Sequence, residues 1–288
     1  MQEPQGQEQQ QQQQQPAATG APSTSDTPLA ATEYLHGSHR RTGSLQAPQV
    51  RSQDHEIEVR TAWAPLLDTD APVARVRPEK AGDAAKYADG RLISVDCVFT
   101  PDECERLVAA ADAIGFGRTS YPKSYRGNMR LITVDESLAG AVWQRLRPLL
   151  PPTLKLEGDE WAACGLNECW RLAKYVPGDR FGAHCDAWFQ RTDDEMSMYT
   201  VNVYMNAVPE PHGGATRFYR ERCSEAPVLS VQPETGLGVV FRQPPGESLL
   251  HDGEQVFLGT KYLFRSDVMY RRVSAGRAEA GAKVPRAG

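Results

Sequence analysis

The sequence predicts an α+β fold whose main body is a β-sandwich or a barrel. Two helical patterns lie within residues 100–146, whereas from Cys169 to Tyr270 the apolar residues alternate or form short runs. Gly and Pro separate these runs, as at Pro177-Gly178. A helical first part followed by closely spaced short strands is typical of a sheet braced by a few helices.

The first predicted helix begins after Thr100, which has the sequence pattern of an N-cap. Pro101 stands at the first helical position, and Glu103 completes a capping box with Thr100. Gly115 is expected to end the helix. One apolar face repeats at helical spacing along this segment: Leu107, Val108, Ala111 and Ile114.

A second helix is predicted over residues 136–146, with Pro148 just beyond it. Leu138, Val142, Trp143 and Leu146 share one side of this segment. Strands are predicted wherever the later apolar runs have period two or are short and bounded by turn residues. These are residues 171–176, 198–208, 216–219, 236–241, 255–258 and 262–270.

Composition divides the chain into four parts. Residues 1–50 are rich in Gln, Pro, Ala, Ser and Thr, with an unbroken Gln run at 9–15, and are predicted to be a disordered tail. Such a tail is either a polyglutamine interaction segment or a solvated extension without a specific role. Residues 51–85 form a linker or strap, residues 86–274 the folded domain, and residues 275–288 a flexible tail. Four apolar residues could give the strap an edge strand: Val59, Trp63, Leu66 and Leu67.

Charge and composition exclude several classes of protein. The formal net charge is −5, which disfavours a dedicated nucleic-acid binder. No apolar run is long enough to span a membrane, and the first residues have no basic start or apolar core of a signal peptide. We therefore expect a cytoplasmic location, with a nuclear one left open, and reduced cysteines. Cys164 and Cys169 could form half of a zinc site, but no second pair follows.

Two histidines and an aspartate form the candidate metal site. His184 and Asp186 are two residues apart, so in an extended segment both side chains point to one face. Alone, this pair is better explained as a surface pair near a turn. His251 follows 65 residues after Asp186 and precedes another apolar run. Two histidines and one carboxylate make the facial triad of non-haem iron sites, although a zinc hydrolase also uses three protein ligands.

Lys261 is the residue that suggests a co-substrate. It follows His251 by ten positions and lies inside the apolar run 256–264. A lysine buried in such a run is costly unless an anion pairs with it, which an anionic co-substrate would do. The alternative is a lysine that extends its charged end from an edge strand to solvent.

The order and spacing of these residues resemble the prolyl 4-hydroxylase-like family of iron(II)/2-oxoglutarate dioxygenases. One stretch of the family pattern stands here as Tyr175, Gly178, Phe181, His184 and Asp186, and another runs without a gap from His251 to Lys261. Gly213, Gly214, Ala215 and Thr216 lie between them. The resemblance covers about residues 90–272 and is strong from 170 to 270.

This resemblance implies a double-stranded β-helix, a jelly-roll of eight strands braced by N-terminal helices. It implies His184, Asp186 and His251 as catalytic iron ligands. It also implies Lys261 as the partner of the 2-oxoglutarate C5 carboxylate, with Tyr175 and Thr216 as hydroxyl donors nearby and Arg265 as a second, lower-ranked cation. The cofactor would be Fe(II), the co-substrates 2-oxoglutarate and O2, the products succinate and CO2, and ascorbate the reductant.

The prime substrate is less defined by the sequence. A protein side chain is the first choice and a small molecule the second, with nucleic acid disfavoured by the acidic balance. Residues 126–130 resemble cytosolic members of the family rather than collagen-type enzymes. Trp188 could wall the substrate side or pack in the core, and His212 is a weaker candidate ligand than His251. A catalytically inactive jelly-roll scaffold is the alternative from another functional class.

Overall fold

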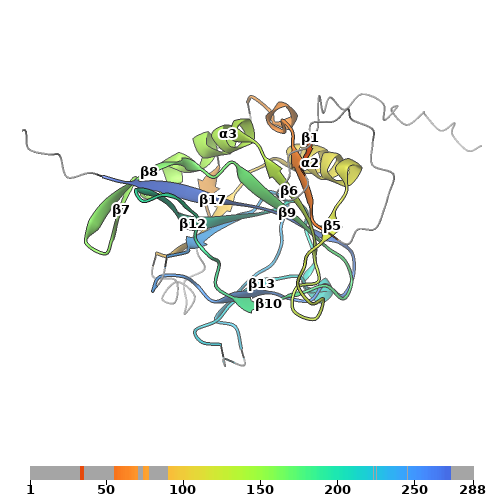
Figure 1. Ribbon diagram of the computed structural model, residues 1–288. Coiled ribbons are helices and arrows are strands. Elements are labelled where there is room, and N and C mark those ends of the chain that lie inside the picture. Colours follow the sequence, from red (N-terminus) through yellow and green to blue (C-terminus); the bar gives the residue numbers. More distant parts are fainter. Residues whose placement is uncertain are drawn as a thin grey trace, which may run out of the picture.

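Two β-sheets face each other, and two helices cover the outer side of the larger sheet (Figure 1). The computed structural model describes residues 33–35, 55–70, 74–77, 90–222, 224, 226–244 and 246–273. The layers are thus helices, large sheet and small sheet, and the space between the sheets is the place for a site.

Eight strands form the core of the two sheets, four in each. In the large sheet the order is β9-β17-β12-β15, and in the small sheet it is β10-β16-β13-β14. The large-sheet strands are β9 Cys169–Tyr175, β12 Glu195–Tyr204, β15 Gly238–Arg242 and β17 Lys261–Arg272. The small-sheet strands are β10 Phe181–His184, β13 Thr216–Phe218, β14 Leu229–Val231 and β16 His251–Gly253. This arrangement is a double-stranded β-helix, so the predicted fold class is confirmed.

Further strands extend the large sheet to thirteen. They are β1 Glu33–Leu35, β2 Ile57–Arg60, β3 Arg75–Val76, β4 Leu92–Asp96, β5 Gly117–Arg118, β6 Met129–Val134, β7 Thr153–Leu156, β8 Asp159–Leu166 and β11 Gln190–Thr192. Short 3-10 helices lie at Ala64–Leu66, Arg147–Leu149 and Glu210–His212. Strand β6 matters most for the site, because it pairs with β9 and prolongs the inner surface of the sheet.

The two helices form where their caps predict them. Helix α2, Pro101–Ile114, has the full capping box of Thr100 and Glu103 and ends at Gly115, whose φ of 99° suits glycine. Helix α3, Glu136–Leu146, begins after Asp135, whose side chain accepts a hydrogen bond from the Leu138 amide. Both predicted helices are confirmed.

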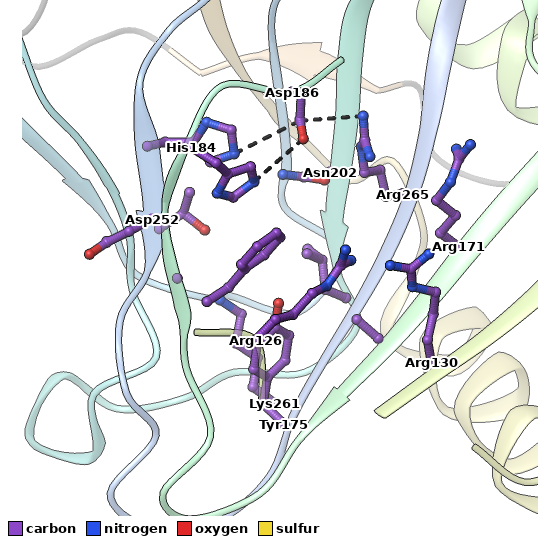
Figure 2. A pocket seen from close by; sticks show the side chains of 16 residues that line it. Arg126, Arg130, Arg171, Tyr175, His184, Asp186, Asn202, Asp252, Lys261 and Arg265 are labelled. Atoms are coloured by element: carbon purple, nitrogen blue, oxygen red, sulfur yellow. Dashed lines mark ion pairs between the residues drawn. The ribbon is translucent and has the colours of Figure 1, made fainter. Parts of the chain in front are cut away.

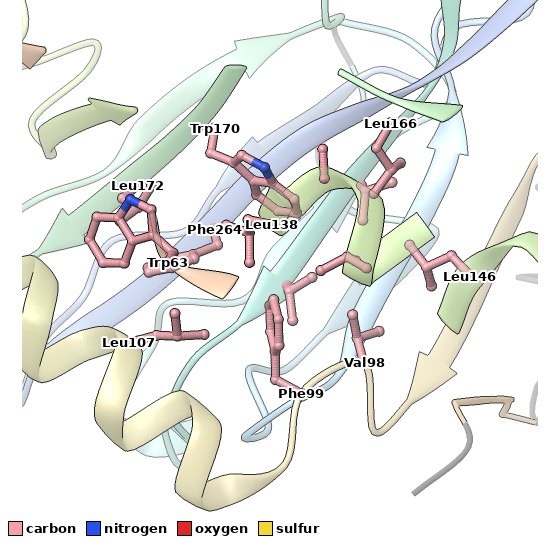
Figure 3. Close-up of a cluster of buried hydrophobic side chains, with 14 of the residues drawn as sticks. Trp63, Val98, Phe99, Leu107, Leu138, Leu146, Leu166, Trp170, Leu172 and Phe264 are labelled. Carbon is pink, nitrogen blue, oxygen red and sulfur yellow. The ribbon is translucent and has the colours of Figure 1, made fainter. Parts of the chain in front are cut away.

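The main apolar core lies between the helices and the large sheet (Figure 3). Trp170 and Leu172 on β9 and Phe264 on β17 point to this side, toward Leu107 of α2 and Leu138 of α3. Because side chains alternate along a strand, the residues between them point to the small sheet instead. A second, smaller cluster fills part of that inner space, including Tyr204, Phe218 and Phe241.

A buried ion pair joins the helices. Glu103 is fully buried and accepts hydrogen bonds of 2.7 and 2.8 Å from the Arg145 guanidinium. It also accepts from the backbone amides of Asp68 and Thr100. Burial alone would raise the pKa of Glu103, but these donors hold it below its ordinary value. The pair fixes α2, α3 and the strap relative to one another.

The strap is part of the fold. Strand β2 pairs in parallel with β6, and the Trp63 ring lies edge-on to Phe264 with its indole N–H bonded to the Thr133 hydroxyl. Val59 and Leu66 are buried as well. An edge strand was expected from these apolar residues; a strand does form, but β2 lies between β1 and β6, and Trp63 and Leu66 fall outside it.

Two expectations differ from the structure. Residues 255–258 are not a strand: the Val256 backbone bonds to Asp179 and Gly178 of a turn, which leaves one isolated bridge with Gly213. Residues 33–35 form strand β1 although they lie in the segment predicted to be disordered, because backbone pairing with β2 does not depend on composition. The rest of that tail and residues 275–288 lie outside the described residues, and the domain boundaries stay a prediction.

Candidate active site

A group of two histidines and one aspartate lies at one end of the small sheet. His184 ends β10 and His251 begins β16, and the two residues are direct cross-strand partners. Asp186 follows His184 by two positions. Within the part of the chain that is described, these three residues are the group able to hold a metal ion, with ligand atoms within 4.8 Å of one another.

Both imidazoles are oriented by backbone carbonyls. Nδ1 of His184 lies 2.8 Å from the Gly182 carbonyl oxygen, and Nδ1 of His251 lies 2.9 Å from that of Leu249. A carbonyl oxygen only accepts, so each Nδ1 carries the proton and each Nε2 keeps its lone pair. The Nε2 atoms lie 3.5 and 3.8 Å from the carboxylate oxygens of Asp186. Burial lowers the pKa of His251 to about 4, which keeps it in the neutral form that binds metal.

Asp186 is held from the large sheet. Its Oδ2 accepts a 2.7 Å hydrogen bond from the Thr200 hydroxyl and lies 3.4 Å from the Arg265 guanidinium. Burial alone would raise the pKa of Asp186, but the Arg265 guanidinium holds it well below its usual range. The side chain is therefore an ionised, oriented ligand.

These donors fit a divalent transition metal. Two neutral imidazoles and one carboxylate, all converging from one side, form the facial set that leaves other coordination positions open. The hydrogen bonds behind them are the supporting contacts that metal-binding histidines and carboxylates ordinarily have. Fe(II) and Zn(II) both accept such donors, so the donor set alone does not select the metal.

Lys261 lies in the same pocket as a buried cation (Figure 2). Its side chain is 2% exposed, and Nζ donates to the Gly214 carbonyl at 2.6 Å, between the Tyr175 and Tyr204 rings. Burial lowers the pKa of Lys261 to about 7. No carboxylate of the described residues forms an ion pair with it. Such a lysine provides a site for an anion from outside the protein.

Two hydroxyl groups accompany Lys261. Tyr175 is its cross-strand partner on β9, and burial raises the pKa of Tyr175 to about 12, so its phenol stays a hydrogen-bond donor. Thr216 on β13 accepts from the Tyr204 hydroxyl at 2.7 Å, which leaves its own proton to donate. The turn at Gly213 and Gly214 brings the carbonyl to Lys261; both have positive φ, and a Cβ on Gly213 would meet the Gln255 carbonyl at 2.1 Å.

Arg265 lies farther along the same face of β17 than Lys261. Four residues of strand separate their Cα atoms by about 13 Å. Arg265 contacts Asp186 and lies 3.2 Å from Asp267, so it is already engaged at the metal end of the pocket. All seven predicted site residues line this one pocket: Tyr175, His184, Asp186, Thr216, His251, Lys261 and Arg265.

Sequence reasoning missed other residues of the pocket. Arg126, Arg130, Arg171 and Asn202 also line it. Arg126 and Arg130 lie in the segment that carried part of the resemblance, but no role followed from it. Arg171 alternates with the buried Trp170 and Leu172 on β9, and that alternation was the available signal for an inward-facing charge.

Other candidates lie elsewhere. Trp188 is 44% exposed, so a core position is wrong for it, and it is not among the residues that line the pocket. His212 lies in a 3-10 helix outside the metal-ligand group. Five cysteines are free thiols, and the group of described metal-binding residues includes none of them: Cys97, Cys104, Cys164, Cys169 and Cys185.

In the described ranges no helix is both long and apolar enough to cross a membrane.

Several solved structures are similar to this chain. One is a viral collagen prolyl hydroxylase from Paramecium Bursaria Chlorella virus-1 in complex with 2OG, with 20% identity, 64% of this chain and 98% of that chain covered, and a TM-score of 0.44. Another is a Pseudomonas putida prolyl-4-hydroxylase, with 21% identity, 67% and 100% covered, and a TM-score of 0.45. A third is a Trichoplax adhaerens prolyl hydroxylase in complex with a hypoxia inducible factor peptide fragment, with 14% identity, 66% and 94% covered, and a TM-score of 0.46. No curated protein sequence matches the chain.

The sequence match to a protein family concerns the strands that carry the site. Residues 170–266 match the 2OG-Fe(II) oxygenase superfamily. This range contains the three candidate metal ligands, Lys261 and both hydroxyl residues beside it. The match also favours iron over zinc for the donor set described above. The strands that carry the site are thus similar in sequence to the 2OG-Fe(II) oxygenase superfamily.

Proposed function

We propose that this protein is an Fe(II)- and 2-oxoglutarate-dependent dioxygenase that hydroxylates an unactivated C–H bond. The observation that carries the proposal is one pocket in which His184, Asp186 and His251 converge and the buried cation Lys261 has no carboxylate partner among the described residues. An iron site alone needs no such lysine, whereas an iron site with a dicarboxylate co-substrate does.

A protein side chain is the proposed substrate, as in the prolyl 4-hydroxylase-like enzymes that the motifs resemble. A small-molecule hydroxylase of the same fold is the second candidate. A catalytically inactive jelly-roll scaffold is the candidate from another class. The complete donor set and the ionised Asp186 favour an enzyme over a scaffold.

The bound Fe(II) and 2-oxoglutarate supply the oxidising chemistry: one oxygen atom of O2 enters the C–H bond, the other enters succinate, and CO2 leaves. The protein contributes orientation. The Gly182 and Leu249 carbonyls hold the two imidazoles as Nδ1–H tautomers, and Thr200 holds the carboxylate of Asp186. In this way no ligand has to reorient when the metal binds.

The co-substrate end of the pocket is prepared in the same manner. Lys261 would pair with the C5 carboxylate of 2-oxoglutarate, while Tyr175 and Thr216 would donate hydrogen bonds near it. Burial between the two sheets excludes water, which strengthens each of these interactions. Ascorbate is the proposed reductant, needed when turnover without prime substrate leaves iron as Fe(III).

The formation of succinate without prime substrate tests the proposal. Protein supplied with Fe(II), 2-oxoglutarate, O2 and ascorbate should produce succinate slowly, and cell extract should increase the rate. Deletion of residues 1–50 should leave the rate unchanged, since the described residues that line the pocket begin at Arg126. His251→Ala is the negative control. Iron binding without succinate under any of these conditions would establish the scaffold instead.

A further inference from the structure

Four guanidinium groups line the pocket besides Lys261 (Figure 2). They belong to Arg126, Arg130, Arg171 and Arg265. A facial iron site needs none of them as ligands, and Lys261 with its two hydroxyl neighbours is already available for the 2-oxoglutarate carboxylate. The cluster therefore requires another explanation.

Strand register gathers three of these arginines on the inner face of the large sheet. Arg171 on β9 is the direct cross-strand partner of Arg265 on β17. Arg130 on β6 faces Ala173, which stands two residues along β9 from Arg171 and so on the same face. Lys261 lies two residues beyond that row. The inner face thus has a lysine end at Lys261 and an arginine end at Arg171 and Arg265, and Arg130 stands level with Ala173 and Leu263 in the row between them.

Arg126 reaches the cluster from the loop between β5 and β6. This loop crosses to the small sheet, where the Gly182 amide donates to the Tyr125 carbonyl and Gly127 donates to that of Arg180. The Arg126 guanidinium lies over the Phe181 ring at 4.3 Å, and that ring stacks on His184 at 3.8 Å. Arg126 is thereby fixed beside the metal ligands, with its side chain directed toward Arg130 (Figure 2).

The protein neutralises this cluster only in part. Glu56 lies 3.1 Å from Arg130, and Asp267 lies 3.4 Å from Arg171 and 3.2 Å from Arg265. Arg126 has no carboxylate partner among the described residues, and its one side-chain hydrogen bond goes to the Asn128 amide oxygen. Burial and the neighbouring Arg126 lower the pKa of Arg130 to about 10, as expected for cations that repel one another.

The charges of Fe(II) and 2-oxoglutarate do not remove the excess of positive charge in the pocket. Five cations line the pocket, whereas its own carboxylates are Asp186 and Asp252, and Asp252 is bonded twice to Arg217. Bound Fe(II) and the two carboxylates of 2-oxoglutarate cancel each other. Positive charge remains at the arginine end, where the four arginine side chains are half-buried and unpaired charge still has a cost.

We propose that the prime substrate carries an oxyanion, a carboxylate or a phosphate, near the C–H bond that is oxidised, and that Arg126, Arg130 and Arg171 bind it. This inference rests on the proposed function. Planar guanidinium groups suit such an anion because each can donate two parallel hydrogen bonds. An acidic side chain of a protein and a small organic acid or phosphate ester share this chemistry.

Defined probes test the inference on the full-length protein. The panel contains a peptide library with Asp and Glu, the matched library with Asn and Gln, dicarboxylic acids of four to six carbons with their methyl esters, and simple phosphate monoesters. For each probe the succinate rate is divided by the rate of the same variant without it. A second readout is the Tm of the protein loaded with Mn(II) and 2-oxoglutarate, which an occupied site raises.

The acidic library or one class of acids should raise both readouts in wild type, and its amide or ester counterpart should not. Arg126→Gln should reduce the stimulation at least tenfold, and Arg126→Lys should restore part of it. Arg118→Gln, at an exposed position on β5, is the matched control and should behave as wild type. Which class responds distinguishes a protein from a small-molecule substrate.

Three results would overturn the inference. The neutral counterparts could stimulate equally, the Arg126→Gln variant could keep its full stimulation, or no anionic probe could change either readout. Failure of the proposed function looks different. In that case wild type binds iron but forms no succinate even without probes, while the Tm measurement still shows whether the arginine cluster binds an anion.

Discussion

The two faces of the large sheet are built from the same strands yet differ in almost every property. On the outer face, Trp170 and Phe264 are fully buried against the helices. On the inner face, the neighbouring Arg171 and Arg265 line a polar pocket with Lys261. The outer face follows the ordinary rule for a core, whereas the inner face buries charge at a cost in stability. The difference indicates that the outer face stabilises the fold and the inner face serves binding.

The largest effect should come from the metal ligands, on the small sheet opposite this inner face. His184→Ala, Asp186→Ala and His251→Ala should each abolish 2-oxoglutarate turnover, because each removes one of three ligands. Cooperative urea unfolding should persist in all three variants, since none of them belongs to the outer core. Residual turnover near the wild-type rate in any of them would show that the ligand set is wrong.

The strongest effect on stability should come from the outer face. Trp170→Ala should lower the free energy of unfolding by about 3–5 kcal/mol, because it opens a large cavity in a closely packed core. Arg171→Gln changes the adjacent residue on the inner face and should cost less than about 1 kcal/mol. Urea unfolding measures both. Similar losses of unfolding free energy in the two variants would contradict the distinction between a stabilising outer face and a binding inner face.

The next effect concerns the two cations of β17. Lys261→Ala should raise the apparent KM for 2-oxoglutarate about 10- to 100-fold, because one charge-assisted hydrogen bond contributes about 1.5–3 kcal/mol. Arg265→Ala should raise it much less, because Arg265 is engaged by Asp186 and Asp267. Steady-state kinetics decide between them. Equal effects or the reverse order would assign the co-substrate to the other cation.

The lowered pKa of Lys261 predicts that both 2-oxoglutarate binding and the stability of the fold depend on pH. Since its pKa in the folded protein is lowered to about 7, the lysine loses its proton as the pH rises above 7, and the affinity for 2-oxoglutarate should fall there. In the unfolded chain the group stays protonated to a much higher pH, so the buried charge opposes folding most below pH 7. Lys261→Met should therefore raise the Tm at pH 6 while impairing 2-oxoglutarate binding, and Lys261→Arg should flatten the pH profile of the KM.

The smallest of these effects concerns the residue behind Asp186. Thr200→Val keeps the shape of the side chain but removes the 2.7 Å hydrogen bond to the carboxylate. We expect the affinity for Fe(II) to fall about 10- to 100-fold, as is usual when a supporting hydrogen bond is lost. Thr200→Ser keeps the hydroxyl and serves as the control. An unchanged affinity in the valine variant would mean that Asp186 is positioned by Arg265 alone.

The sequence predicted the parts of the fold that are encoded locally. The capping box at Thr100 and the apolar face of 136–146 predicted both helices, and period two predicted β9, β12 and β17. Strand β8 was not predicted from the sequence, because its burial pattern is irregular and its register with β17 shifts between Met269 and Tyr270. Residues 255–258 have the composition of a strand, but their backbone is paired with a turn far away in sequence.

The site shows the same division between local and long-range information. The spacing of His184, Asp186, His251 and Lys261 is readable because the family pattern fixes it. The arginine cluster could not be predicted from the sequence, because Arg130 and Arg171 become neighbours only through the register of β6 against β9. Arg126 depends in addition on a loop that crosses between the sheets. Nothing in the sequence itself states those distances.

The most direct test of the central claim is an anaerobic titration of the wild-type protein with Fe(II) and then 2-oxoglutarate, followed by visible absorption. If the three ligands hold iron and the co-substrate binds beside it, a weak charge-transfer band should appear on addition of 2-oxoglutarate. The band should be absent in His251→Ala and should require more 2-oxoglutarate in Lys261→Ala. A wild-type protein that binds no Fe(II) and gives no band would contradict the account.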